Sequence, residues 1–211
     1  ASTKAVFHFN MEEAPKDYYF FKVGISGLTG GHSGDDIEKK RANANKLLVR
    51  FFYNEMKKFD LRISDIQSGG LHNAIPRDGW AVCAVPMKDK ENIRIDANVY
   101  VSEIEEEYSV TEKSLKFYVE SADAADVIEK ECAKKIIASL QAVDNGVFAM
   151  SQDIDWLVET SSNLASIHKN GNEIEIVTSQ RSNIGSARKN MSATVAAAFE
   201  LGGAEVFTTD G

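Results

Sequence analysis

The chain carries the same order of apolar patterns twice, and this repetition restricts the folds that it can adopt. Each copy predicts a strand, a helix, two strands and a second helix, over about residues 15–110 and 111–208. That order is typical of the split β-α-β arrangement of ferredoxin-like units. We therefore expect an α+β fold in which two ferredoxin-like βαββα units form a mainly antiparallel sheet with helices on one face.

The first copy opens on a strand from Tyr18 to Ile25, rich in aromatic and β-branched residues. Apolar side chains then recur at helical spacing, which predicts a helix over residues 35–59. Ser33 followed by Asp36 resembles a capping box at the start of that helix. The remaining expected elements are the strands Ile63–Gln67 and Trp80–Val85 and a helix from Lys90 to Tyr108.

The second copy opens on an expected strand, Leu115–Glu120, and an amphipathic helix, Ala124–Val143. A hairpin follows, because Asn170-Gly171 is a turn signal between two alternating segments. The expected elements of this part are the strands Val158–His168 and Glu173–Gln180, a helix Ile184–Leu201 that ends at Gly202-Gly203, and a strand Ala204–Phe207.

Composition argues against several classes of protein. The formal net charge is −8 at pH 7 and phosphate binding needs a basic surface, so we expect no nucleic-acid partner. No apolar run reaches the roughly 18 residues of a membrane span, and the residues after Ala1 lack the apolar core of a signal peptide. We therefore expect a cytoplasmic protein with no membrane partner.

Few residues could hold a metal ion or form a disulfide. Cys83 and Cys132 lie in separate apolar stretches without CxxC spacing, and we expect both to be small buried residues in a reducing compartment. The histidines lack the spacings of zinc ligands; they are His8, His32, His72 and His168. We expect neither a metal site nor a cofactor within this chain.

One histidine lies in an unusual loop. His32 stands among four glycines in the segment GLTGGHSG, residues 27–34, between the first expected strand and helix. A glycine-rich turn lets backbone amides converge, and a helix N-terminus favours negative charge. His32 could there donate a hydrogen bond to an oxyanion or carboxylate, or it could be a turn residue that satisfies backbone carbonyls. Spacing alone leaves both interpretations open.

Three further polar residues are candidates for a site; two lie at the end or in a turn of expected strands, and the third lies within one. Asn73 shortly precedes Pro76, where it could hold a peptide carbonyl or form an Asx turn. Arg181 ends a strand just before a helix, which suits either bidentate binding of a carboxylate or a surface salt bridge. Asn163, in the segment ETSSNL, is a further substrate-binding candidate. The residues alone decide none of these alternatives.

Taken together, several segments resemble one known family, in order along nearly the whole chain. They are ISGLTGGHSG (25–34), RANANK (41–46), NAIPR (73–77), VETSSNLA (158–165), SQRS (179–182) and ELGGAEV (200–206). This ordered set resembles the bacterial aminoacyl-histidine dipeptidases, also called Xaa-His or carnosine-cleaving dipeptidases. They belong to the di-zinc metallopeptidase clan that includes carboxypeptidase G.

The resemblance is to the lid, or dimerisation domain, of these enzymes over residues 1–211. It implies a cytosolic zinc dipeptidase that hydrolyses Xaa-His dipeptides, whose catalytic domain with two zinc ions lies outside this chain. In the family the zinc-binding His-x-Asp motif and the paired glutamates precede the region that this chain matches, and no His-x-Asp motif occurs in the sequence. The chain therefore resembles an excised lid, inactive alone, that contacts its own catalytic domain and pairs as a homodimer.

The resemblance also assigns roles to residues. His32 corresponds to the lid histidine that stabilises the tetrahedral oxyanion, often in the partner subunit of dimeric relatives. Asn73 corresponds to the asparagine that holds the backbone of the dipeptide substrate, and Arg181 to the arginine that binds its free carboxylate. Asn163 lies within a matching segment and is kept as a substrate-binding candidate.

A second hypothesis starts from the repeat rather than from the resemblance. Tandem ferredoxin-like units could form a stand-alone regulatory module that binds an amino acid or another small anion at the glycine loop. Zinc-ligand motifs encoded beside this segment would favour the dipeptidase lid over this module.

Overall fold

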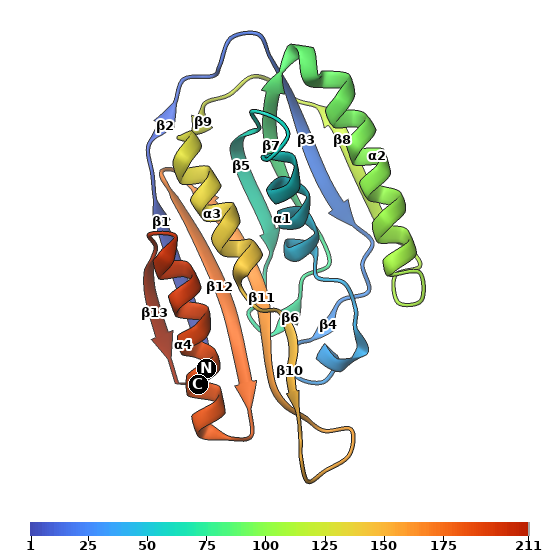
Figure 1. Ribbon diagram of the computed structural model, residues 1–211, viewed down its shortest axis with the longest axis vertical. Helices are drawn as coiled ribbons and strands as arrows, with labels where there is room; N and C mark the ends of the chain where they lie inside the picture. The colour runs from blue at the N-terminus through green and yellow to red at the C-terminus, as the bar shows by residue number, and fades with distance from the viewer. Residues whose placement is uncertain (211) are drawn as a thin grey trace.

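The computed structural model describes residues 1–210 and shows one large sheet with its helices on one face (Figure 1). The α-helices of this range are α1 (Ala44–Glu55), α2 (Lys90–Glu107), α3 (Lys130–Ala142) and α4 (Gly185–Leu201). Two 3₁₀ helices, η1 (Ile37–Lys39) and η2 (Met87–Asp89), lie before α1 and α2. No helix in the described range is long and apolar enough to cross a membrane.

The strands of the large sheet run antiparallel to their neighbours throughout the described range, which confirms the expected α+β class. From edge to edge they are β13 (Glu205–Thr209), β1 (Ser2–His8), β12 (Glu173–Ser182), β11 (Val158–Asn170), β5 (Arg62–Gly69), β7 (Gly79–Pro86), β3 (Tyr18–Ser26) and β8 (Lys116–Ser121). A further strand, β10 (Gly146–Met150), pairs with β11 outside this order.

Two short ribbons complete the strands. One pairs β2 (Met11–Glu12) with β9 (Val127–Ile128), and the other pairs β4 (Gly31–His32) with β6 (Ala74–Ile75). Figure 1 shows the β4–β6 ribbon beside the lower part of β11, near β10. The second ribbon, which contains His32, therefore lies against β11, a strand that is distant from it in the sequence.

The two ferredoxin-like units are nested rather than consecutive. One unit consists of β3, α1, β5, β7, α2 and β8, with its strands in the order β8-β3-β7-β5. The other consists of β1, α3, β11, β12, α4 and β13, with the equivalent order β13-β1-β12-β11. The first unit is thus inserted between β1 and α3 of the second, and the pairing of β5 with β11 joins them.

This nesting changes two assignments made from the sequence. The strand expected to open the second copy, now β8, pairs with β3 and closes the first unit. The second unit opens instead on β1, a strand that the pattern did not predict and that lies between β12 and β13. A ferredoxin-like unit places its last strand beside its first, so sheet pairing rather than order along the chain decides membership.

The first expected helix begins much later than predicted. Of residues 35–43 only η1 is helical, and α1 begins at Ala44 with Asn43 as its N-cap. The Asn43 Oδ1 atom accepts a hydrogen bond from Lys46 N at 3.3 Å. The capping box predicted for Ser33 and Asp36 is therefore wrong, because these residues belong to the segment held by the β4–β6 ribbon.

The second half follows the sequence more closely. The Asn-Gly hairpin is confirmed, with Gly171 at φ 58° between β11 and β12. The helix expected from Ala124 is shorter, since Val127 and Ile128 form β9 and α3 begins at Lys130. Pairing of β9 with β2 removes these residues from the helix.

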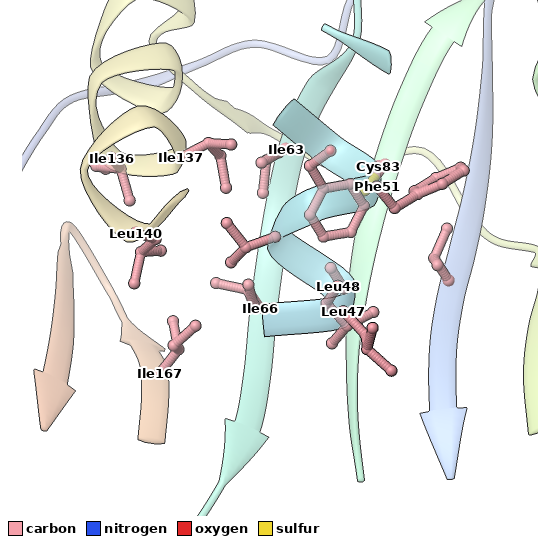
Figure 2. Packing of buried hydrophobic residues seen from close by; sticks show 14 of the residues in the cluster. Leu47, Leu48, Phe51, Ile63, Ile66, Cys83, Ile136, Ile137, Leu140 and Ile167 are labelled. Carbon is pink, nitrogen blue, oxygen red and sulfur yellow. The ribbon is translucent and has the colours of Figure 1, made fainter. Parts of the chain in front are cut away.

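One hydrophobic core lies between the helices and the sheet and spans both units (Figure 2). Its centre combines apolar side chains of α1, α3, β5, β7 and β11, each at most 3% exposed; they are Leu47, Leu48, Phe51, Ile136, Ile137, Leu140, Ile63, Ile66, Cys83 and Ile167. Full burial of one large apolar side chain contributes about 1.5–3 kcal/mol to the stability of the folded state. The shared core explains why the nested units form one body.

The two cysteines differ in exposure. Cys83 is fully buried as expected, and burial raises the pKa of its thiol. Cys132 on α3 is only half-buried, which the sequence did not predict. Both are free thiols.

Glu55 at the end of α1 makes stability depend on pH. Burial raises the pKa of this carboxyl to about 7, although the Lys58 ammonium at 3.1 Å opposes the shift. The folded pKa is above the ordinary value, so the stabilisation by neutral Glu55 is complete below pH 4.5 and is lost as the pH rises through 7. Glu55→Gln is expected to stabilise the chain by about 1 kcal/mol at pH 8 and to have little effect at pH 4.5.

Urea unfolding followed by circular dichroism across this pH range measures the effect. Glu103→Gln, at an exposed carboxylate of α2, is the matched control. If the free energy of unfolding depends on pH in the same way in Glu55→Gln and in the unaltered chain, the raised pKa of Glu55 is contradicted.

Candidate functional site

The β4–β6 ribbon brings two of the predicted site residues together. His32 pairs with Ala74, and Ser33 N donates a hydrogen bond to the carbonyl of Asn73 at 2.8 Å. Asn73 is half-buried, and its side chain has no hydrogen-bond partner within residues 1–210. The Asx-turn interpretation is therefore not supported, since a backbone bond from Ala74 N to Leu71 O closes this turn.

Two side chains that follow His32 in the sequence, Asp36 and Arg41, bind the backbone of the loop. Asp36 Oδ2 accepts a hydrogen bond from His32 N at 2.8 Å, and Arg41 Nη1 donates to Gly30 O at 2.5 Å. Gly31 has φ 140°, and a Cβ there would lie 2.4 Å from Asp36 Oδ2, so this position requires glycine. The loop does not lead into the N-terminus of a long helix, and the predicted dipole effect on His32 is therefore wrong.

The amides of this loop are engaged. His32 N bonds Asp36, Ser33 N bonds Asn73, and Gly34 N and Asp35 N both point at the ring of His32. Backbone amides that already have partners do not converge on an anion. The geometry therefore gives no support to an amide-lined anion site in the glycine loop.

Glu112 ties the two ends of the loop segment together, and the sequence did not reveal this role. Its carboxylate is 6% exposed and accepts hydrogen bonds from Thr29 N at 2.7 Å and from Ala42 N at 2.8 Å. Thr29 lies before His32 and Ala42 lies just before α1. Glu112 thus determines where the loop begins and ends.

Glu112→Gln is expected to destabilise the chain by about 2 kcal/mol, because a glutamine amide can accept from only one of the two N–H groups. The matched control is Glu105→Gln, at an exposed position of α2. Amide hydrogen exchange should quicken at Thr29 and Ala42 in Glu112→Gln and stay unchanged in the control. Unchanged exchange at both amides would contradict the role of Glu112 as a clamp.

The His32 ring presents a donor on its outer nitrogen. Nδ1 lies 3.2 Å from Gly34 N and 3.3 Å from Asp35 N, and accepts from these amides when the ring is neutral. It also lies 3.2 Å from Asp35 Oδ2, to which it donates when the ring is protonated. Nε2 carries a hydrogen in both states. The side chain is 40% exposed, so Nε2–H can reach a ligand.

The side chain of Arg181 lies near that of His32, next to Gly34. A Cβ on Gly34 would be 3.2 Å from both Arg181 Nη1 and His32 Nδ1. Arg181 has no carboxylate within 4.0 Å in residues 1–210, so the predicted alternative of a surface salt bridge is not found. The inserted unit supplies His32 and the other unit supplies Arg181.

Asn163 is buried next to the β4–β6 ribbon. It is 1% exposed, its Nδ2 donates to Ala74 O at 2.8 Å, and its Oδ1 accepts from Asn43 Nδ2 at 3.4 Å. Both ends of its amide are thus used within the protein. This arrangement attaches the β4–β6 ribbon to β11, so Asn163 holds the ribbon in place and offers no free group to a ligand.

No group of three or more His, Cys, Asp or Glu side chains in the described range could hold a metal ion. The hydrogen-bond donors that the site offers are His32 Nε2–H, the Arg181 guanidinium and the Asn73 amide. They suit a ligand that carries a carbonyl or oxyanion near a carboxylate.

No protein-family model matches the chain. It is 34% identical over 200 residues to the cytosol non-specific dipeptidase of Escherichia coli strain K12, covering 94% of this chain and 41% of that protein. Its structure matches the crystal structure of aminoacylhistidine dipeptidase from Vibrio alginolyticus with a TM-score of 0.95 and 31% identity, covering 98% of this chain and 42% of the other.

Both relatives are dipeptidases, and the chain spans less than half the length of either. The resemblance to aminoacyl-histidine dipeptidases predicted from the ordered segments is confirmed, and the chain is homologous to one segment of these dipeptidases.

Proposed function

We propose that this chain is the lid of a cytosolic zinc dipeptidase that hydrolyses Xaa-His dipeptides. The observation that carries the proposal is that the side chains of His32 and Arg181 lie close together at Gly34. In a dipeptide, the scissile carbonyl and the terminal carboxylate are separated by one residue, about 3.8 Å between successive Cα atoms. One substrate can therefore contact both side chains at once.

Each residue then has a distinct task. His32 Nε2–H donates to the oxyanion that forms on the scissile carbonyl. Arg181 binds the C-terminal carboxylate, and the Asn73 amide holds the peptide backbone of the substrate. Asn163 positions the ribbon that bears His32 and Asn73. The resemblance implies two zinc ions, which in this proposal are held by a catalytic segment outside the chain.

Hydrolysis assays on two proteins test the proposal. The full-length protein that carries this chain, loaded with zinc, should cleave β-alanyl-histidine, and the 211-residue chain alone should not. Tight stoichiometric binding of zinc by the isolated chain, or hydrolysis by it, would contradict the assignment as a lid. Inactivity of the full-length protein on every Xaa-His dipeptide would contradict the substrate class.

The partners of the lid are part of the proposal. The chain contacts its own catalytic segment and pairs with a second copy as a homodimer. The strand β8 ends the large sheet and is paired only on its β3 side in the described range, so it can receive another strand. Light scattering on the isolated chain should give twice 23.2 kDa, and a clean monomer at high concentration would contradict pairing through this segment.

A further inference from the structure

A cavity of about 420 Å³ lies at the end of β12, next to the proposed substrate site. Its walls include Arg181 and Ser179 of β12, His72 of the loop before β6, and Arg188 of α4. Three of these side chains carry or can carry positive charge. Two of them, His72 and Arg188, have no role in the proposed function so far.

The two arginines of the cavity have no acidic partner. Within residues 1–210, neither Arg181 nor Arg188 has a carboxylate within 4.0 Å. This is notable in a chain with a net charge of −8, where acidic side chains outnumber basic ones. An unpaired guanidinium that lines a cavity is available to an anion.

Buried polar atoms without partners lie at the same place. Ser179 is 7% exposed, and its Oγ has no hydrogen-bond partner in the described range. The Nε of Arg188 is likewise buried and without a partner there. Buried polar groups in folded proteins are normally hydrogen-bonded, so each such atom needs an explanation. A ligand in the cavity would supply the missing partner.

We propose that Arg188 is a second carboxylate-binding residue of the dipeptide site. The C-terminal carboxylate of the substrate lies between the guanidinium groups of Arg181 and Arg188, and Ser179 Oγ donates to one of its oxygens. This inference rests on the proposed function and extends it to specificity. A peptide that continued beyond the second residue would present a neutral amide to two cations, so the cavity selects a free C-terminus.

Steady-state kinetics of the full-length protein test the role of Arg188. The substrates are β-alanyl-histidine and its C-terminal amide. Arg188→Met should raise KM for the acid by about tenfold, the loss of one charge-assisted contact, and leave kcat within about twofold. KM for the amide should not change. Arg188→Lys keeps the charge and should have a smaller effect on the acid.

Arg94→Met on α2 is the matched control, because this arginine is exposed and lies outside the cavity. Equal changes for the acid and the amide, or no change for either, would overturn the proposal. Thermal unfolding of each variant separates misfolding from lost binding. If the unaltered protein cleaves no dipeptide, the proposed function fails before the variants are compared, so the two failures are distinguishable.

Discussion

Replacing His32 by alanine in the full-length protein is expected to lower kcat for dipeptide hydrolysis by about 10²–10³-fold, with little change in KM. The lost group is a hydrogen-bond donor that acts where charge develops in the transition state, so binding of the ground state is largely unaffected. The β4–β6 ribbon and Asp36 hold the backbone of His32 independently of its ring. The variant should therefore fold normally.

The dependence of kcat on pH distinguishes a hydrogen-bond donor from a general base at His32. Nδ1 accepts from the Gly34 amide in the neutral ring and donates to Asp35 in the charged ring, so Nε2 keeps its hydrogen in both. A donor role therefore leaves the His32 contribution to kcat intact when the ring is protonated. A contribution that vanishes when the ring is protonated would show that His32 acts as a base instead.

His8→Ala is the control for this variant. His8 lies on β1, half exposed between Glu173 and Glu205, at the end of the strand away from Arg181. It should leave kcat unchanged. An equal loss in both variants would mean that the effect of His32→Ala arises from general destabilisation.

Asn43→Ala is expected to lower the free energy of unfolding by about 3 kcal/mol, the largest stability effect predicted for this chain. Asn43 is 4% exposed and caps α1. Its Nδ2 also donates to Asn145 Oδ1 and to Leu164 O, each at 3.0 Å. The substitution removes both a helix cap and buried hydrogen bonds between the two units.

The measurement is thermal unfolding of the 211-residue chain. A loss of 3 kcal/mol corresponds to a Tm lower by about 6–12 °C for a protein of this size. Asn54→Ala, an exposed asparagine of the same helix, should change Tm little. A similar Tm for Asn43→Ala and the unaltered chain would show that Asn45, which also donates to Leu164 O, replaces the lost contact.

The segment RANANK (41–46) makes contacts that link the two units. Lys46 Nζ donates to the carbonyls of Leu140, Gln141 and Val143 at the end of α3, and burial lowers its pKa to about 8. Asn43 and Asn45 reach β11 from the first turn of α1. This segment therefore joins the nested units, a structural role that its place among the matching segments did not reveal.

Local pattern predicted the elements whose side chains alternate or recur regularly. The hairpin of β11 and β12 is one such case, since its alternation and Asn-Gly turn are properties of the segment itself. The start of α1 was missed because residues 35–43 are held by contacts with Glu112 and the β4–β6 ribbon. A buried carboxylate such as Glu112 looks the same in sequence as a solvated one.

Sequence by itself determined the α+β class, the hairpin and the ordered segments that identify the dipeptidase relatives, because these depend on local periodicity and on residue identity. Only the tertiary structure decided which strands form each unit, that Asn163 is buried and bonded to the β4–β6 ribbon, and that His32 and Arg181 lie close together at Gly34. These features depend on pairing between segments far apart in the chain. Insertion of one unit into the other brings the β4–β6 ribbon against β11, and no local pattern specifies that contact.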